Sequence, residues 1–424
     1  MGLTRRVAGL VCGLAIVLSP VAHAALPAIT VATDADNHAR FVTADGRPFI
    51  PQGVNWVVVS PGTPATQQNI SFNPDYYPAH RTAIHQSLRA IARDGFNFVR
   101  IRLDAVGIAG PAGTFGLNPT YMANVIDFIR AAAAEGLYVE PTGQWLPANY
   151  YMLVPRDGFP EPDRQNTAGI NEMLLSRGES HAYGRYIADV LAAIKAADPH
   201  LLSAVFCVDL WNELGFESKD LPFSRETGRY TAEDGSVIDL SDATSRQRLA
   251  DAATTRWIDG VIAEAKQAAP GMLFTASVFS PLDVFRPGYV GVFQHDAKWG
   301  DPRQPLRLSA IQDSKADFLE IHLYPHTAGA TLDDQLASLE YSPTRDSKPV
   351  LLAETGAFKG EIKDIGQVDA TLRGVLRQSC ALHFAGWAYW TWDTDGQTDL
   401  WNLKENGGYL EKRLSPKFFD WCKA

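Results

Sequence analysis

The sequence predicts an α/β protein folded as an eight-stranded (β/α)₈ barrel. Short runs rich in Val, Ile, Leu, Phe and Tyr alternate with amphipathic stretches along most of the chain. The runs are apolar on both faces, which is typical of parallel strands that are covered on both sides. A doubly wound open sheet, the competing architecture, would carry a Gly-rich phosphate turn after its first strand, and none follows here. We therefore expect a closed barrel with helices around it.

Eight apolar runs are the expected strands: 50–59, 96–103, 137–142, 202–210, 273–279, 318–324, 350–353 and 386–392. The expected helices between them are 81–94, 119–135, 179–197, 246–269, 332–339, 365–382 and 416–422. Gly95 and Gly136 are stop signals for the first two helices. Only seven helices are expected, because the stretch between Phe279 and Phe318 is rich in Pro, Gly and aromatic residues. That stretch predicts a long loop with at most a short helix.

Three expected strand-to-helix connections are unusually long: 146–178, 215–245 and 280–316. In barrels of this kind the loops after the strands carry the functional site, so these segments are candidate cleft walls. Asp45-Gly46, within 41–50, is a hairpin-turn signal, and we expect a small hairpin that caps the bottom of the barrel. Because no repeat or linker interrupts the pattern, 25–424 is expected to be a single domain.

The first 24 residues have the pattern of a secretory signal peptide. Arg5 and Arg6 precede an apolar run over 7–18, and Ala22-His23-Ala24 forms an A-x-A cleavage site. The apolar run is too short to span a bilayer. We therefore expect a secreted or periplasmic protein, released by cleavage near Ala24.

Charge and cysteine content restrict the partners. The formal net charge is −10 at pH 7 and no basic stripe is present, which argues against nucleic acid and anionic membrane surfaces. A neutral polysaccharide is compatible with that charge. No His, Cys or Asp cluster has metal-ligand spacing, so we expect no metal, no cofactor and a monomer. Cys207 is expected to be a buried thiol, whereas Cys380 and Cys422 can pair in an oxidising compartment or remain free.

Two glutamates end apolar strands. Asn212-Glu213 follows the fourth expected strand, and Glu354 follows the seventh. Since parallel strands of a barrel end at one rim, the two carboxylates should face each other. Glycoside hydrolysis needs such a pair, one to protonate the leaving oxygen and one to act on the sugar carbon. We assign Glu213 as general acid/base and Glu354 as nucleophile.

Charged residues on two other strands fit this arrangement. His322 and Tyr324 share one face of the sixth strand and can hydrogen-bond a carboxylate. Arg100 and Arg102 share one face of the second strand, and an arginine directed into a barrel needs an anion. Glu354 is the natural partner, although a salt bridge without a catalytic role remains an alternative.

Indole rings near the strand ends are candidate platforms for sugar rings. Trp390 and Trp392 share a face of the eighth strand, and only one of them should reach substrate because aromatics in a barrel are more often core. Weaker candidates near other strand ends are Trp56, Trp145, Trp211 and Trp401.

Six motifs in this order resemble glycoside hydrolase family 5, the cellulase-like family of the retaining (β/α)₈ hydrolases. They are Gly53-Val54-Asn55-Trp56, Gly95-Phe96-Asn97-Phe98-Val99-Arg100, Trp211-Asn212-Glu213, His322-Leu323-Tyr324, Glu354-Thr355-Gly356 and Gly386-Trp387-Ala388-Tyr389-Trp390. The resemblance covers nearly the whole chain after the first 24 residues.

The resemblance implies a role for each matching residue. Glu213 is implied as acid/base and Glu354 as nucleophile, braced by Arg100. The remaining implied contributors are Asn212 on the sugar 2-hydroxyl, His322 and Tyr324 supporting the carboxylates, and Trp390 beneath the reacting sugar. We also expect Asn55, Trp56, Gln144 and Trp145 to contact substrate.

The third strand departs from the family pattern. Family members usually carry a His at its end, where this sequence has Gln144. Gln can hydrogen-bond a sugar hydroxyl but cannot titrate, so recognition of the reacting sugar should differ from a standard cellulase or mannanase. A neighbouring family of the same clan stays open.

The sequence therefore predicts a metal-independent retaining β-glycosidase that cleaves a β-linked glycan internally. An exo-acting glycosidase, or one acting on a glycolipid or other glycoconjugate, is the alternative within enzymes. From another class, a non-catalytic carbohydrate-binding barrel is the alternative, but a binding protein needs neither Glu213 nor Glu354.

Overall fold

The computed structural model describes residues 25–34, 38–62, 68–155, 158–161, 163–284, 303–341, 348–394 and 396–422. The expected signal peptide, residues 1–24, lies outside this part of the chain. Among the described residues, no helix is long and apolar enough to cross a membrane.

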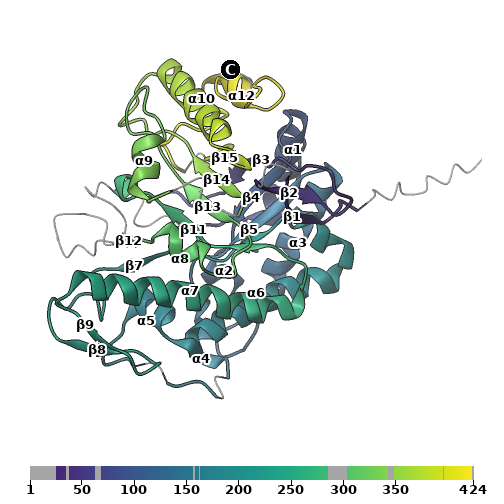
Figure 1. The fold of residues 1–424 in the computed structure, drawn as a ribbon. Coiled ribbons are helices and arrows are strands. Elements are labelled where there is room, and N and C mark those ends of the chain that lie inside the picture. Colours follow the sequence, from purple (N-terminus) through teal and green to yellow (C-terminus); the bar gives the residue numbers. More distant parts are fainter. Residues whose placement is uncertain are drawn as a thin grey trace, which may run out of the picture.

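Parallel strands form the centre of the molecule (Figure 1). In chain order they are β3 (Gln52–Trp56), β4 (Phe98–Arg102), β5 (Tyr138–Thr142), β6 (Val208–Asp209), β10 (Phe274–Thr275), β11 (Ser277–Phe279), β13 (Leu319–His322), β14 (Val350–Thr355) and β15 (Gly386–Tyr389). Their order in the sheet is β10-β6-β5-β4-β3-β15-β14-β13-β11. Only Ala276 separates β10 from β11; the former pairs with β6 and the latter with β13. These two pieces of one strand join the ends of the sheet, so the predicted barrel of eight strands is confirmed.

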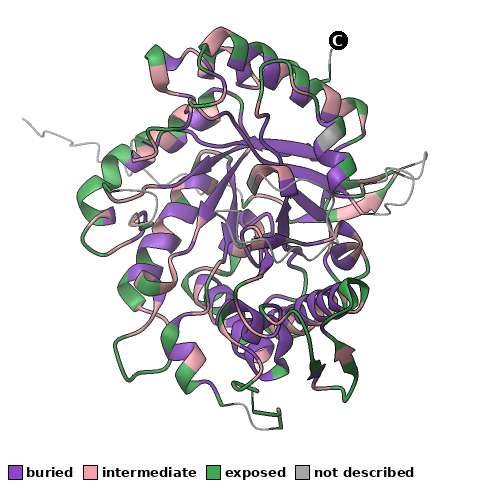
Figure 2. Ribbon diagram, turned by 90° about the vertical axis from the view of Figure 1, so that its left-hand side faces the viewer, coloured by how far each residue is buried: buried purple, intermediate pink, exposed green. Residues whose placement is uncertain are grey.

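Five long helices surround the strands: α1 (Tyr77–Arg93), α3 (Pro119–Ala134), α6 (Arg177–Ala197), α7 (Ala243–Ala268) and α10 (Ile365–Ala381). Four begin at a side chain that caps the free backbone N–H groups of the first turn: Asn118, Ser176, Asp242 and Asp364. Each helix buries one face and exposes the other, and the strands inside them are almost entirely buried (Figure 2).

The three long connections contain short elements. The first holds α4 (Ala148–Leu153) and α5 (Gly169–Leu175), and the second holds β7 (Gly215–Glu217) and the hairpin of β8 (Arg229–Thr231) and β9 (Val237–Asp239). The third holds the 3₁₀ helix η2 (Pro281–Val284), β12 (Arg303–Pro305) and α8 (Leu308–Gln312), the short helix that was expected there. Strands β12 and β7 pair antiparallel, so the connections after the fourth and fifth barrel strands are tied together.

One predicted element is wrong and another is shorter than expected. The expected strand 202–210 forms as β6 only at Val208–Asp209, because the 3₁₀ helix η1 (Pro199–Ala204), capped by Asp198 and started by Pro199, occupies 202–204. The expected helix 416–422 is absent; α12 (Glu411–Leu414) ends before Ser415, whose extended backbone is what a following proline favours. The remaining short helices are α2 (Ala105–Ile108), α9 (Asp333–Ser338) and α11 (Glu405–Gly408).

A hairpin closes the bottom of the barrel, with a partner that the sequence did not indicate. The Asp45-Gly46 turn forms, with Gly46 at φ +83°, but β2 (Ala39–Thr43) pairs mainly with β1 (Ile29–Thr33). Phe41 packs edge-on against Phe206 and Phe318, which precede β6 and β13.

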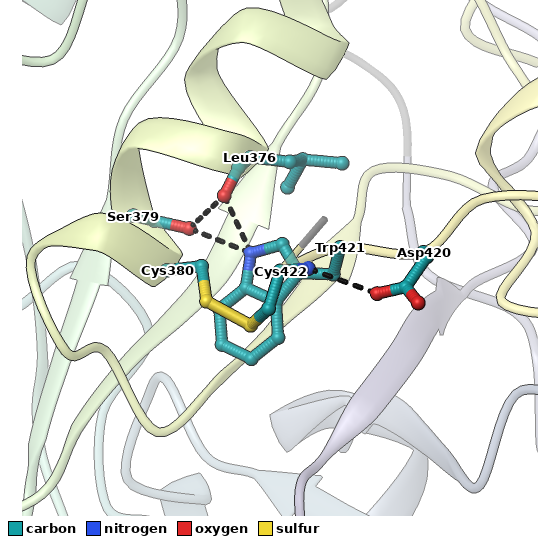
Figure 3. Close-up of a disulfide and its surroundings, with 6 residues drawn as sticks. All are labelled: Leu376, Ser379, Cys380, Asp420, Trp421 and Cys422. Carbon is teal, nitrogen blue, oxygen red and sulfur yellow. Dashed lines mark hydrogen bonds between the residues drawn. A yellow bond between two sulfur atoms is a disulfide. The ribbon is translucent and has the colours of Figure 1, made fainter. Parts of the chain in front are cut away.

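Cys380 of α10 forms a disulfide with Cys422, 42 residues later (Figure 3). Beside it the indole N–H of Trp421 donates to Ser379 Oγ at 3.1 Å and to the carbonyl of Leu376. These contacts anchor the C-terminal segment on the helix that follows β14. Cys207 is a buried free thiol, as predicted.

Candidate active site

The guanidinium of Arg100 on β4 is the centre of the polar network inside the barrel. It is fully buried and lies within ion-pair distance of four carboxylates. Their distances from it are 3.1 Å for Glu140, 2.6 Å for Asp209, 3.0 Å for Glu320 and 2.6 Å for Glu354. Inward-facing positions of β4 and its neighbours converge on the barrel axis, which explains why one arginine reaches so many strands.

This cluster holds more carboxylates than cations. Burial, followed by the charge of Glu320, raises the pKa of Glu140, and burial, followed by the charge of Asp209, raises that of Glu320. Both carboxyls therefore favour the protonated form more than an exposed glutamic acid does. Arg100 stays charged, because the surrounding carboxylates outweigh the cost of burial and raise its pKa.

Glu354 is held by two donors from the barrel wall. Arg100 Nη1 lies 2.6 Å from Oε1, and the phenol of Tyr324 donates to Oε2 at 2.7 Å. The side chain is almost completely buried, but both of its oxygens are satisfied. These two hydrogen bonds fix the orientation of the carboxylate.

Glu213 is held differently. It lies four residues beyond β6, with φ +56°, and its backbone N–H donates to Ser277 Oγ of β11 at 2.8 Å. A positive φ is costly for a residue with a Cβ and persists only where neighbours impose it. Its carboxylate accepts from Arg303 Nη1 of β12 at 2.5 Å. Burial opposes ionisation of Glu213, but the charge of Arg303 and the hydrogen bond from His322 outweigh burial and hold the pKa below its usual range.

His322 lies between the two glutamates. Its Nδ1 is 3.3 Å from Glu213 Oε1 and 3.5 Å from Glu354 Oε2, and its Nε2 is 3.5 Å from Glu320 Oε1. Burial lowers the pKa of His322, but the charge of Glu354 and the hydrogen bonds to Glu213 and Glu320 outweigh burial and raise the pKa to about 9. The ring therefore favours its protonated form at neutral pH, and Nδ1 donates to Glu213 Oε1.

The structure brings the two predicted carboxylates together. One ligand atom each of Glu213, His322 and Glu354 lies within 4.8 Å of the others. Three such atoms could surround a cation, but Arg100, Tyr324 and Arg303 already donate to these carboxylates and His322 is protonated. The donor set therefore suits a pair of carboxylates acting on an organic substrate better than a metal ion.

A cleft of about 600 Å³ opens at the C-terminal ends of β3, β4 and β5. Among its lining residues are the polar side chains of Gln68, Asn69, Arg102, Asp104, Gln144 and Gln397. Trp145 also lines it, with half of its surface exposed. A larger cavity, of about 940 Å³, lies beside α7 on the outside of the barrel and contains none of the site residues.

The predicted aromatic platforms divide into two groups. Trp390 adjoins the cleft, because its indole N–H donates to Gln397 at 2.9 Å, and Trp145 lies in the cleft. Trp56 is a correction: it points away from the barrel axis and packs against Phe72 and Phe128. The strand alternation that turns Asn55 inward turns Trp56 outward.

Three further tryptophans considered as sugar platforms do not line the cleft. Trp392 and Trp211 are buried in the main hydrophobic core. Trp401 lies beneath Lys359 and is not among the described residues that line the cleft.

Asn55 is a second correction. It is buried, donates to the carbonyl of Ala353 at 2.9 Å and accepts from Arg100 Nη1 at 3.1 Å. It therefore braces Arg100 and does not reach substrate. Asn212 also accepts from Arg100, through Nη2 at 3.1 Å, beside Glu213.

Arg303 and the buried acids were not predicted. Nothing in the sequence distinguishes Arg303 within its long loop. Asp209, Glu140 and Glu320 did carry a signal, because each is a lone acidic residue inside an apolar run of strand length. Such a residue must be paired inside the barrel or exposed at its end.

No family model matches the sequence, and no curated protein sequence matches it. Solved structures do match. The endo-1,4-β-mannanase from Rhizomucor miehei superposes with a TM-score of 0.57 at 15% identity, covering 92% of this chain and 99% of that chain. The exo-β-1,4-mannosidase from Opitutaceae bacterium strain TAV5 superposes with a TM-score of 0.56 at 18% identity. The match covers 91% of this chain but only 62% of the mannosidase.

A third match, the β-1,4-D-mannanase from Cryptopygus antarcticus, has a TM-score of 0.50 at 13% identity and covers 92% of this chain and 94% of that chain. At these identities the likeness shows the fold. The fold expected from the resemblance to glycoside hydrolase family 5 is confirmed.

Proposed function

We propose that the protein is a retaining β-glycosidase that hydrolyses a β-linked glycan. The observation that carries the proposal is the spacing of Glu213 and Glu354, whose closest carboxylate oxygens lie within 4.8 Å. Retaining glycosidases hold their two carboxyl groups about 5–5.5 Å apart, whereas inverting ones leave about 6.5–9.5 Å for a water molecule. The short spacing supports direct attack by one carboxylate.

In the first step Glu354 attacks the anomeric carbon, and the bond from that carbon to the glycosidic oxygen breaks. Glu213 delivers a proton to the departing oxygen, leaving a glycosyl ester on Glu354. Arg100 and Tyr324 keep the Glu354 oxygens aligned before attack. In the second step Glu213 removes a proton from water, which attacks the same carbon and releases Glu354.

Proton donation by Glu213 requires a change at Arg303. The ion pair holds the pKa of Glu213 low, and a general acid must carry a proton. Arg303 is partly exposed and belongs to a loop strand rather than to the barrel. In the proposed cycle it withdraws from Oε2 as the leaving group enters, which raises the pKa of Glu213 when a proton is needed.

The proposed substrate is a β-1,4-linked glycan cut within its chain. The mannanases named above support this class, because they share the fold over more than nine-tenths of this chain. Gln144 replaces the usual His beside the cleft and limits any direct transfer of their specificity. If the protein releases single sugars from chain ends, or acts only on a glycoconjugate, then the proposal of internal cleavage is wrong.

The test is a screen of the purified protein on β-mannans, β-glucans, xylans and aryl β-glycosides, with the first-formed anomer identified by NMR. We expect β-configured product first, and no turnover by Glu354→Gln although it still binds glycan. An α-configured first product would refute retention. Unchanged turnover by the variant would refute the assignment of Glu354, and binding without turnover by the unaltered protein would indicate the binding-only alternative.

Export after cleavage near Ala24 is part of the proposal. The Cys380–Cys422 disulfide supports it, since such bonds persist in oxidising compartments. Mass spectrometry of protein recovered from outside the cytoplasm should give a chain that begins at or near Ala25. Cys380 and Cys422 of that chain should carry no free thiols.

A further inference from the structure

Arg102 is the arginine of the cleft that lacks a carboxylate partner. It follows Arg100 by two residues on β4 and therefore faces the same way, one layer nearer the rim. Arg100 and Arg303 each pair with a glutamate of the site, but Arg102 forms no ion pair within 4.0 Å in the described part of the chain. Its side chain lines the 600 Å³ cleft and is partly exposed there.

Most of the hydrogen-bonding capacity of Arg102 is unused. One Nη2 group donates to Gln144 Oε1, the residue that departs from the family pattern. A guanidinium has five N–H donors in a planar fork, so four remain for a ligand. Asn69 holds the backbone beneath it by donating to the Arg102 carbonyl at 2.6 Å.

No carboxylate among the described cleft-lining residues pairs with this charge at contact distance, although the more distant charges of Glu354, Glu213 and Asp104 act on it. Gln68, Asn69, Gln144 and Gln397 are uncharged amides. The carboxylate of Asp104 also lines the cleft, but it accepts from the backbone N–H of Gly107 at 2.6 Å and caps α2. Burial lowers the pKa of Arg102, which means that its charged form lacks the solvation it would have in water. An incoming anion would restore that solvation.

Arg102 also lies near the two glutamates. It is two residues from Arg100, whose Nη1 lies 2.6 Å from Glu354 Oε1, and Trp390, the expected floor of the reacting sugar, is linked to the cleft through Gln397. A ligand group on Arg102 therefore belongs to a sugar bound at or next to the reacting position.

We propose that Arg102 and Gln144 select a glycan that carries an anionic group on that sugar, either a uronate carboxylate or a sulfate ester. Both anions present two oxygens to a planar guanidinium, a geometry in which Arg binds them by two parallel hydrogen bonds. This inference rests on the proposed glycosidase function and adds the substrate class, an acidic rather than a neutral β-linked glycan.

The test uses matched substrates. A soluble β-1,4-mannan or β-1,4-glucan is compared with the same glycan after selective oxidation of its C6 hydroxymethyl groups to carboxylates, and with its C6-sulfated form. The measured quantity is the ratio of kcat/KM on the acidic glycan to kcat/KM on the neutral glycan. We expect a ratio above one for the unaltered protein, falling as NaCl is raised because salt screens the ion pair.

Arg102→Gln should lower the ratio by about 10- to 100-fold, the size expected for a hydrogen bond to a charged group. Arg102→Lys, which keeps the charge but loses the fork, should lower it less. Arg89→Gln is the matched control: it removes one positive charge from an exposed ion pair with Glu135 on the helix surface and should leave the ratio unchanged.

The outcomes separate the two proposals. If neutral glycans are hydrolysed as well as acidic ones and Arg102→Gln leaves the ratio unchanged, the inference is wrong while the glycosidase function stands. If the folded protein hydrolyses neither kind, the proposed function is wrong and the inference fails with it. Circular dichroism shows whether the variants fold. If they do not, the ratio of kcat/KM on acidic and neutral glycans, and its dependence on salt, still test the inference in the unaltered protein. The anion is identified as carboxylate or sulfate by which of the two acidic glycans loses its preference in Arg102→Gln.

Discussion

The two glutamates of the site lie in unlike halves of the barrel. Glu354 belongs to β14, a fully buried strand of six residues, and its partners Arg100 and Tyr324 come from β4 and the end of β13. Glu213 follows β6, a strand of two residues, and its partner Arg303 comes from a loop strand. One carboxylate is positioned by the closed sheet and the other by long connections.

The difference follows from what each position must do. A nucleophile has to stay aligned with the anomeric carbon, and the hydrogen bonds from Arg100 and Tyr324 hold Glu354 in place at little further cost. A general acid/base has to gain and lose a proton within one cycle, so its partner must be able to move. Loops supply that freedom because fewer buried contacts hold them.

The largest expected effect separates the two carboxylates by chemistry. Glu354→Ala should lower kcat by at least about 10⁴-fold, the size of losses on removing a nucleophile. Added azide should restore turnover and yield the α-glycosyl azide, because azide attacks from the side that Glu354 occupied. Glu213→Ala with azide and an aryl glycoside should yield the β-glycosyl azide. NMR of the products checks both, and the same anomer from both variants would contradict the division of roles.

The next effect concerns stability. Arg100→Met leaves four carboxylates around a buried site without their shared cation, and we expect a loss of about 3–5 kcal/mol in the free energy of unfolding. Arg303→Met, at a partly exposed ion pair, should cost less than about 1 kcal/mol. Denaturant midpoints measure both. Equal losses would mean that the loop-borne pair is as structural as the barrel pair.

Removing the disulfide tests whether the C-terminal segment stabilises the part of the barrel that carries Glu354. Replacing both cysteines in Cys380→Ser/Cys422→Ser opens a covalent loop of 42 residues, and we expect a loss of about 2–4 kcal/mol. Because the bond joins α10 to the C-terminal segment and not to the site, kcat should be unchanged where the variant is folded. A lower kcat under those conditions would show that the anchor also positions β14.

The smallest effect is a shift in pH dependence. The charge of Arg303 lowers the pKa of Glu213, so Arg303→Gln should raise it. The basic limb of the kcat/KM profile, where the general acid loses its proton, should move to higher pH by on the order of one unit. Arg307→Gln, four residues along and paired with Asp251, is the control and should leave that limb in place. A basic limb unmoved in Arg303→Gln would exclude the ion pair as its cause.

Much of the fold was predictable because apolar periodicity reports burial directly. The eight strand positions, five long helices and the pairing of Glu213 with Glu354 at one rim all follow from runs of residues and the geometry of a barrel. The failures are local. A cap and a proline produced 3₁₀ helix at 202–204, where the expected strand 202–210 should have begun, and strand alternation turned Trp56 away from the cleft.

The sequence by itself determined which side chains lie at the C-terminal rim of the barrel, because the residue pattern predicts where each strand ends and which of its side chains point inward. It determined Glu213, Glu354, His322 and Tyr324 as neighbours. Only the tertiary structure decided how each is charged. Arg303 lies 90 residues from Glu213 along the chain, and it reaches the carboxylate only because β12 pairs with β7. Ionisation depends on distances of a few ångströms between segments remote in sequence, and no local pattern encodes them.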